Sequence, residues 1–127
     1  MNDKYAEYRR KLYDLKIEKG EITEVKFLES VAAPFDNDGS ALFPLPERYQ
    51  VTYKLYPTEE SDITCVITLP LVGWNKKFLG TGNGGQAGTI VYPAIDAGVS
   101  HGYATANTDM GSSIDSAKMY LAYERWI

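Results

Sequence analysis

Two runs in which apolar and polar residues alternate constrain the fold of this chain more than any other feature. The alternation covers residues 49–55 and 63–69, and turn-like residues 57–61 separate the two runs. The apolar positions are Tyr49, Val51, Tyr53 and Leu55 in the first run and Ile63, Cys65, Ile67 and Leu69 in the second. A period of two places such residues on one side of a strand. The pattern predicts an antiparallel hairpin with one face in the core and the other in solvent.

The segments on either side of this hairpin predict further elements. Before it come an amphipathic helix at 3–18, a strand at 23–27 and a loop at 33–47 that holds three prolines. After it come a strand at 77–80, a glycine-rich segment, a helix at 91–99, a strand at 103–106 and a last helix from about Ser116. An antiparallel start followed by β-loop-α-β-α predicts an α/β fold with a mixed sheet.

Composition limits the partners of the chain. A length of 127 residues is typical of one domain, and a net charge of −4 with scattered basic residues argues against nucleic acid. Cys65 is the only cysteine, so an internal disulfide and a multi-cysteine metal site are excluded, and no metal site is predicted. No apolar run suggests a secretory signal or a membrane span. A cytoplasmic location is compatible with this, although the compartment stays open.

The glycine-rich segment is the strongest candidate for a functional loop. Five of the nine residues Gly80–Gly88 are glycine. Glycine loses more conformational entropy on folding than any other residue. A run of this kind therefore indicates that the backbone approaches another group closely or takes positive φ angles.

Three interpretations of this segment compete. A phosphate-binding P-loop requires Gly-Lys-Ser/Thr, and here the segment ends in Gln86-Ala87-Gly88. A dinucleotide-binding loop stays open, because Asp109 follows a predicted strand further on. The second interpretation is an oxyanion hole, in which bare backbone N–H groups hold a developing negative oxygen. The third is a tight turn without a ligand.

Two single residues are weaker candidates. Asp109 follows the carboxyl end of a predicted strand, where α/β sheets bind ligands, but it could equally form an Asx turn. His101, the only histidine, is expected at the end of a helix, where an imidazolium complements the helix dipole. A catalytic role for His101 is not expected, because a catalytic base needs a serine and an orienting acid.

The amino-acid sequences of two segments resemble motifs of the tannase/feruloyl esterase family. The first motif is Trp74-Asn75 through Phe78-Leu79-Gly80 to Gly82-Asn83-Gly84-Gly85, and the second is Gly102-Tyr103-Ala104-Thr105 followed by Thr108-Asp109. Their order and separation match the family, and the resemblance covers roughly residues 22–127. It implies an α/β-hydrolase fold and a serine carboxylesterase that cleaves phenolic-acid esters through a Ser-His-Asp triad, without a cofactor.

The resemblance also assigns site residues. It makes the backbone N–H groups of Gly84, Gly85 and Gln86 the oxyanion-hole candidates, and Asn83 and Asp109 the substrate-binding candidates. Gly-x-Ser-x-Gly does not occur in the sequence, and the family places its nucleophile, acid and base further along. Histidine is absent after Met110-Gly111, and Gln86 replaces a common aromatic residue, so the substrate class stays open.

These observations predict a partial α/β-hydrolase domain over residues 1–127 that is the N-terminal portion of such an enzyme. Its parts are a helix at 1–20, antiparallel strands at 21–70, and the glycine-rich loop with β/α units at 71–127. The last residues, Trp126 and Ile127, lie in a helical pattern without a stop signal, which favours a truncated sequence. The chain alone is expected to be inactive. The alternatives are a non-catalytic fragment that binds a small ligand or a protein, nucleotide binding at the glycine-rich segment, and self-association through an exposed sheet edge.

Overall fold

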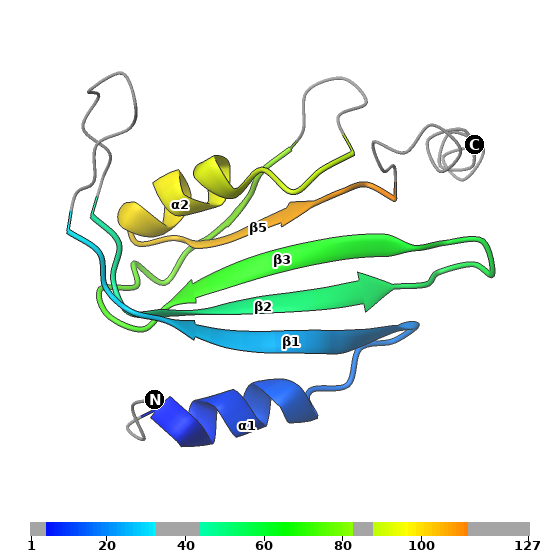
Figure 1. Cartoon of the computed structure of the whole chain (residues 1–127), viewed down its shortest axis with the longest axis horizontal. Coiled ribbons are helices and arrows are strands. Elements are labelled where there is room, and N and C mark those ends of the chain that lie inside the picture. The colour runs from blue at the N-terminus through cyan, green and yellow to red at the C-terminus, as the bar shows by residue number, and fades with distance from the viewer. Residues whose placement is uncertain (1–4, 33–43, 83–87, 112–127) are drawn as a thin grey trace.

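The fold is a five-stranded mixed sheet with one helix on each face (Figure 1). A computed structural model describes residues 5–32, 44–82 and 88–111. The elements are α1 (Ala6–Asp14), β1 (Gly20–Leu28), β2 (Arg48–Leu55), β3 (Ile63–Pro70), β4 (Phe78–Gly80), α2 (Tyr92–Ser100) and β5 (Ala104–Thr108). The predicted α/β fold with a mixed sheet is confirmed. The helix expected from Ser116 lies outside the described residues.

The strands follow the order β1-β2-β3-β5-β4. The first three pair antiparallel in sequence order, and β5 then pairs antiparallel with β3. Only β4 and β5 run parallel, with Leu79 opposite Thr105. The predicted hairpin is confirmed as β2 and β3, with Val51 opposite Ile67. At its turn the ammonium group of Lys54 lies 2.9 Å from Oδ1 of Asp62.

The first core layer lies between α1 and the face of β1 and β2. It is built from Tyr5, Val25, Tyr49 and Val51, each at most 5% exposed. The Tyr49 ring lies edge-on to the rings of Tyr5 and Phe27, and its hydroxyl donates to the backbone oxygen of Tyr5 at 2.7 Å. Tyr5, the N-cap residue of α1, therefore anchors the short helix to the sheet, and the buried hydroxyl of Tyr49 has a hydrogen-bond partner.

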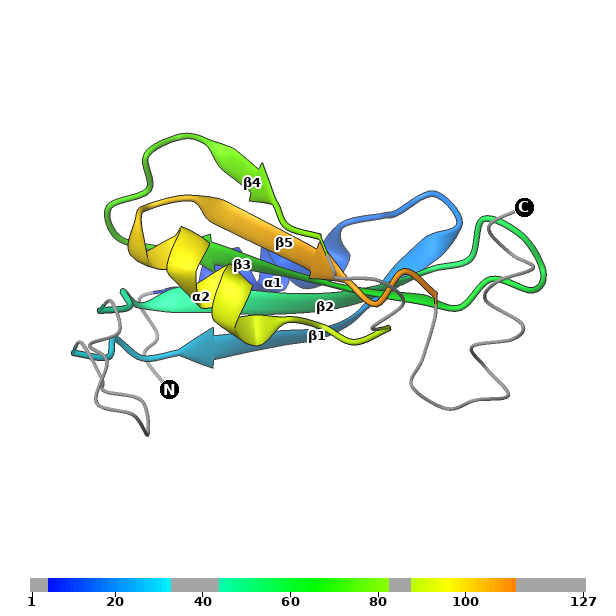
Figure 2. The same ribbon diagram turned by 90° about the horizontal axis from the view of Figure 1, so that it is seen from above.

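The second core layer lies on the opposite face, where α2 crosses β3 and β5 (Figure 2). Ile95 and Val99 of α2 pack with Val66 of β3, and all three side chains are at most 1% exposed. The expectation that the hairpin has a solvent face is therefore wrong for β3. Thr68, at a polar position of the alternation, is also 1% exposed, because α2 covers that face. Cys65 is buried as expected from the other face of the pattern.

The two edges of the sheet differ. On β1 the backbone of Val25 is occupied by side chains of α1, because its N–H donates to the Tyr13 hydroxyl at 3.0 Å and its carbonyl accepts from Nε of Arg9 at 3.4 Å. On β4 every residue is exposed, including Phe78 at 61% and Leu79 at 37%. In the part of the chain that the structure describes, no strand covers the outer side of β4.

Candidate active-site region

The parallel pair β4 and β5 creates the one place in the described fold where two strand ends of the same direction meet. Gly80 lies opposite Ala106, so the segment that leaves β4 starts beside the last residues of β5. Helix α2 lies between these two strands in the sequence and packs against β5. Ligands of open α/β sheets bind outside the carboxyl ends of strands. This end of the pair is therefore the candidate active-site region.

Hydrogen bonds fix the start of the glycine-rich segment at this end of the sheet. The backbone N–H of Thr81 donates to the Ala106 carbonyl at 2.9 Å, and the Thr81 hydroxyl donates to the same oxygen at 2.8 Å. Gly82 is exposed, and Gly88 at the far end is buried with φ of 62°. The left-handed angle at Gly88 is one that a residue with a Cβ rarely adopts. At position 88 the glycine thus meets a conformational requirement.

Asn107 of β5 joins both ends of this segment. Its Nδ2 donates to the Thr81 hydroxyl at 2.7 Å, with the Thr81 and Gly82 carbonyls at 3.2 and 3.4 Å. Its Oδ1 accepts the backbone N–H of Val91 at 2.9 Å, directly before α2. Asn107 was not among the site residues predicted from the sequence. The available signal was an amide side chain near the end of a strand of small residues that follows a glycine-rich loop.

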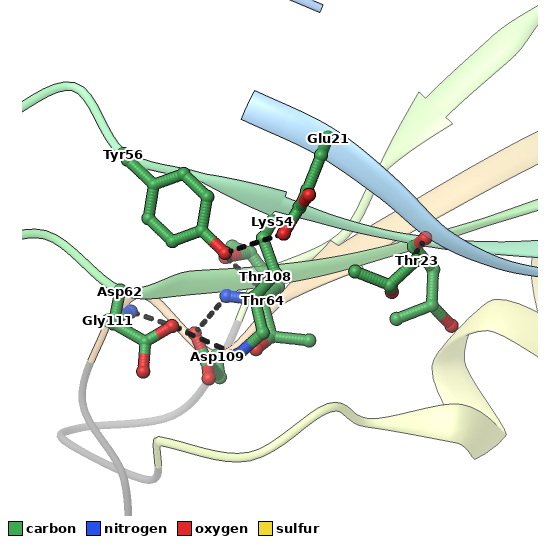
Figure 3. Close-up of polar contacts among 10 residues, drawn as sticks. Glu21, Thr23, Lys54, Tyr56, Asp62, Thr64, Thr108, Asp109 and Gly111 are labelled. Atoms are coloured by element: carbon green, nitrogen blue, oxygen red, sulfur yellow. Dashed lines mark hydrogen bonds and ion pairs between the residues drawn. The ribbon is translucent and has the colours of Figure 1, made fainter. Parts of the chain in front are cut away.

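Asp109 lies just beyond the end of β5, and its carboxylate is turned toward β3 (Figure 3). Its backbone N–H donates to the Thr64 carbonyl at 3.0 Å, and its Oδ1 accepts the Thr64 N–H at 3.0 Å. The same Oδ1 accepts the N–H of Gly111 at 2.9 Å, which is the Asx turn considered above. Met110 and Gly111 both have positive φ angles in this turn. Asp109 thus ends β5, and substrate binding by this residue stays a prediction.

The other predicted site residues lie outside the described residues. These are Asn83, Gly84, Gly85 and Gln86, between the described residues Gly82 and Gly88. Their roles in the oxyanion hole and in substrate binding stay predictions. His101 is the C-cap residue of α2, and its Nδ1 lies 2.8 Å from the Ala97 carbonyl. Its expected location at a helix end is therefore confirmed.

Two opposite charges, Arg48 of β2 and Asp96 of α2, influence each other on the side of the sheet that α2 covers. Burial lowers the pKa of the Arg48 guanidinium and raises the pKa of the Asp96 carboxyl, and each charge partly opposes the shift of the other. Arg48 on β2 is 7% exposed and donates through one terminal nitrogen to the Glu29 and Pro46 carbonyls, at 2.8 and 3.1 Å. These bonds compensate only part of the cost of burying the cation, because Nε of Arg48 is buried without a hydrogen-bond partner in the described part of the chain.

Metal and membrane features are limited to what the described residues show. No group of three or more His, Cys, Asp or Glu side chains within 5–32, 44–82 and 88–111 is arranged to hold a metal ion. No helix in the same ranges is long and apolar enough to cross a membrane.

Comparison with known proteins links this geometry to esterases. No protein-family model matches the chain. The chain is 36% identical over 74 residues to an uncharacterized esterase of Xanthomonas campestris pv. campestris, a match that covers 58% of the chain and 13% of that protein. The structure of feruloyl esterase B from Aspergillus oryzae superimposes with a TM-score of 0.66 at 20% identity, and the match covers 83% of the chain and 21% of that structure. The chain has the fold of part of a feruloyl esterase.

A second structure supports the same assignment of fold. An esterase from Aspergillus oryzae matches with a TM-score of 0.62 at 21% identity, over 84% of the chain and 23% of that structure. The resemblance to the tannase/feruloyl esterase family is confirmed at the level of fold. The chain spans about a fifth of these two esterase structures and 13% of the Xanthomonas esterase.

Proposed function

We propose that the chain supplies the oxyanion-hole loop of a serine carboxylic ester hydrolase that acts on esters of phenolic acids. The observation that carries this proposal is the position of the glycine-rich segment, which leaves β4 at the carboxyl end of the parallel pair. Backbone N–H groups at such an end can hold an oxyanion, because glycine leaves room for a substrate carbonyl. The match to the Xanthomonas esterase and the feruloyl esterase fold support the same conclusion.

In this mechanism the N–H groups of Gly84, Gly85 and Gln86 donate to the ester oxygen as it becomes negative. A serine elsewhere in the complete enzyme attacks the carbonyl carbon, the alcohol leaves, and water then releases the acid from the acyl-enzyme. One lost donor in such a hole lowers kcat by about 10² to 10³. By itself the chain should not turn over esters, because the motif that activates a serine does not occur in its sequence.

Grafting tests the proposal directly. Residues 80–109 of this chain would replace the structurally equivalent segment of feruloyl esterase B, and hydrolysis of methyl ferulate would be measured. The graft should retain activity, and replacing Gly84 and Gly85 by valine within it should lower kcat by about 10² or more with little change in KM. A graft whose kcat does not respond to the two valines would remove the oxyanion-hole assignment.

A further part of the proposal concerns association between copies of the chain. The outer side of β4 presents the backbone of Phe78 and Gly80 together with exposed apolar side chains, whereas Arg9 and Tyr13 occupy the backbone at the middle of β1. An exposed apolar edge strand is a template for pairing with another strand. We infer that two copies associate through β4 rather than through β1.

A further inference from the structure

Asn107 is a buried amide one residue before the end of β5. It is 3% exposed and lies opposite Val66 in the β3–β5 register, on the face that α2 covers. A buried amide needs hydrogen-bond partners, because an unsatisfied one costs its full desolvation. The partners of Asn107 lie outside β3, its neighbour in the sheet at that position. They belong to the two points where the chain enters and leaves the glycine-rich segment.

The chemistry of these partners fixes the orientation of the amide. On one side lie the Thr81 hydroxyl and the Thr81 and Gly82 carbonyls, and the carbonyls can only accept hydrogen bonds. On the other side lies the Val91 N–H, which can only donate. Nδ2 therefore faces Thr81 and Oδ1 faces Val91. A flipped amide would set oxygen against oxygen and N–H against N–H.

This arrangement makes one side chain span the whole segment. Gly82 follows β4 by two residues and Val91 directly precedes α2, and the Asn107 side chain bonds to both of them. A glycine-rich chain has many accessible conformations, so holding its ends at a set separation removes much of that freedom. Thr81 assists, because its hydroxyl donates to Ala106 while it accepts from Asn107.

We propose that Asn107 is a positioning residue for the glycine-rich segment. Its amide sets the separation of Gly82 and Val91 and thereby the placement of the backbone N–H groups that meet the ester oxygen. The effect on the N–H groups rests on the proposed esterase function, whereas the effect on the separation of Gly82 and Val91 rests on the hydrogen bonds alone. Asn107 does not need to touch the substrate to act in this way.

Three variants of the full chain test the clamp, by which we mean the hydrogen bonds of Asn107 to Thr81 and Gly82 on one side and to Val91 on the other. Asn107→Leu removes the hydrogen bonds on both sides. Asn107→Asp keeps an acceptor for Val91 and sets a carboxylate against the Thr81 and Gly82 carbonyls, a contact that becomes a hydrogen bond when the acid is protonated. Thr68→Val is the matched control, because Thr68 is equally buried on the same face and its hydroxyl makes no hydrogen bond in the described part of the chain.

Amide hydrogen exchange, followed by NMR, is the first measurement. Val91 should exchange roughly tenfold faster in Asn107→Leu and near the wild-type rate in Asn107→Asp and Thr68→Val. Ile95 and Val99 within α2 report whether the helix stays folded. Unchanged Val91 exchange in Asn107→Leu with a folded helix would overturn the clamp. If Asn107→Leu does not fold, Asn107→Asp decides. Its Thr81 amide, which donates to the Ala106 carbonyl, should exchange faster than in the wild type at neutral pH and match the wild type in acid, and no such change overturns the clamp.

Binding of methyl ferulate, measured by NMR titration, is the second measurement. Asn107→Leu should weaken binding about tenfold, and Asn107→Asp should weaken it at neutral pH and recover in acid, with Thr68→Val unchanged. Wild-type affinity in Asn107→Leu together with fast Val91 exchange would overturn the positioning role while the clamp stands. Absence of binding by the wild-type chain would count against the proposed function and would leave the exchange result on the clamp intact.

Discussion

Gly98 of α2 lies so close to Thr105 of β5 that a methyl group at position 98 would overlap the Thr105 hydroxyl. The same methyl group would lie 2.9 Å from the Thr105 methyl carbon, and Thr105 is 0% exposed. At this point the backbone of α2 at Gly98 therefore packs directly against the side chain of Thr105 on β5. A glycine at this helix–sheet contact allows the last turn of α2 to approach the beginning of β5 closely.

The first prediction follows from this contact. Gly98→Ala in an open helix position would stabilise the protein by about 1 kcal/mol, but here overpacking should destabilise it by about 1–3 kcal/mol. Urea denaturation measures the difference in unfolding free energy. Adding Thr105→Ala removes the overlapping atoms, so the double variant should recover stability relative to Gly98→Ala. Equal stability of Gly98→Ala and the wild type would contradict the observed contact.

The second prediction concerns the protected edge of β1. Tyr13→Phe removes the acceptor of the Val25 N–H and should lower the unfolding free energy by about 1 kcal/mol. Tyr8→Phe on the same helix is the control, because Tyr8 is 55% exposed and should leave stability nearly unchanged. Thermal unfolding monitored by circular dichroism compares the two. A larger loss in Tyr8→Phe than in Tyr13→Phe would show that the edge contact contributes nothing.

The third prediction concerns β4. A lysine in place of Phe78 puts a charge on the exposed edge, which is how natural proteins discourage pairing between sheets. Sedimentation velocity over a range of concentrations should show weaker self-association for Phe78→Lys than for the wild type. Tyr8→Lys serves as the control, because it adds the same charge to the exposed side of α1. If both variants associate like the wild type, β4 is not the contact surface.

The fourth prediction concerns alkaline pH. Burial, followed by the neighbouring Cys65 thiol, raises the pKa of Tyr53 from 10.0 to about 12. Because the folded-state pKa is raised, the stabilisation is complete below pH 10 and is lost as the pH rises from 10 toward 12. Near-ultraviolet absorbance should show a late phenolate step that Tyr53→Phe removes. Cys65→Ala should move this step to lower pH, and a late step that survives Tyr53→Phe would assign it to another tyrosine.

The fifth prediction concerns the structural role of Asp109 at the end of β5. Asp109→Ala leaves the Thr64 and Gly111 amides without their acceptor and should cost about 1–3 kcal/mol of stability. Asp109→Asn keeps an oxygen at the same place and should cost less. Urea denaturation tests this order. Equal stability of the two variants would mean that the Asx turn does not stabilise the end of β5.

The sequence predicted those parts of the fold whose cause is local. The period of two at Tyr49–Leu55 and Ile63–Leu69 is a property of each strand, and the hairpin of β2 and β3 follows from it. The boundaries were less accurate at α1, which was expected to reach residue 18 and ends at Asp14. Leu15 turns to an extended conformation there, and Lys19 takes a positive φ of 54° before β1 begins.

The buried threonines and Asn107 could not be predicted in the same way. Thr68 follows the alternation of a solvent-facing residue, and it is buried only because α2, which begins at Tyr92, crosses its face. The structural role of Asn107 likewise depends on its hydrogen bonds to Thr81 and Val91, which are distant in sequence. Such partners are set by how β4 and β5 pair, and that pairing is not visible in either strand alone.

The strand order determines when the sheet can be completed. β5 lies between β3 and β4, yet it follows both of them along the chain and is the last strand among the described residues, so β4 pairs with the sheet only through residues made after it. The first three strands form a meander of local contacts, whereas β3 can pair with β5 only after distant residues such as Cys65 and Thr108 come together. Because contacts close in sequence form faster than distant ones, we expect the meander to fold during synthesis before the parallel pair assembles. Pulse-labelled exchange during refolding should then protect Val51 before Leu79.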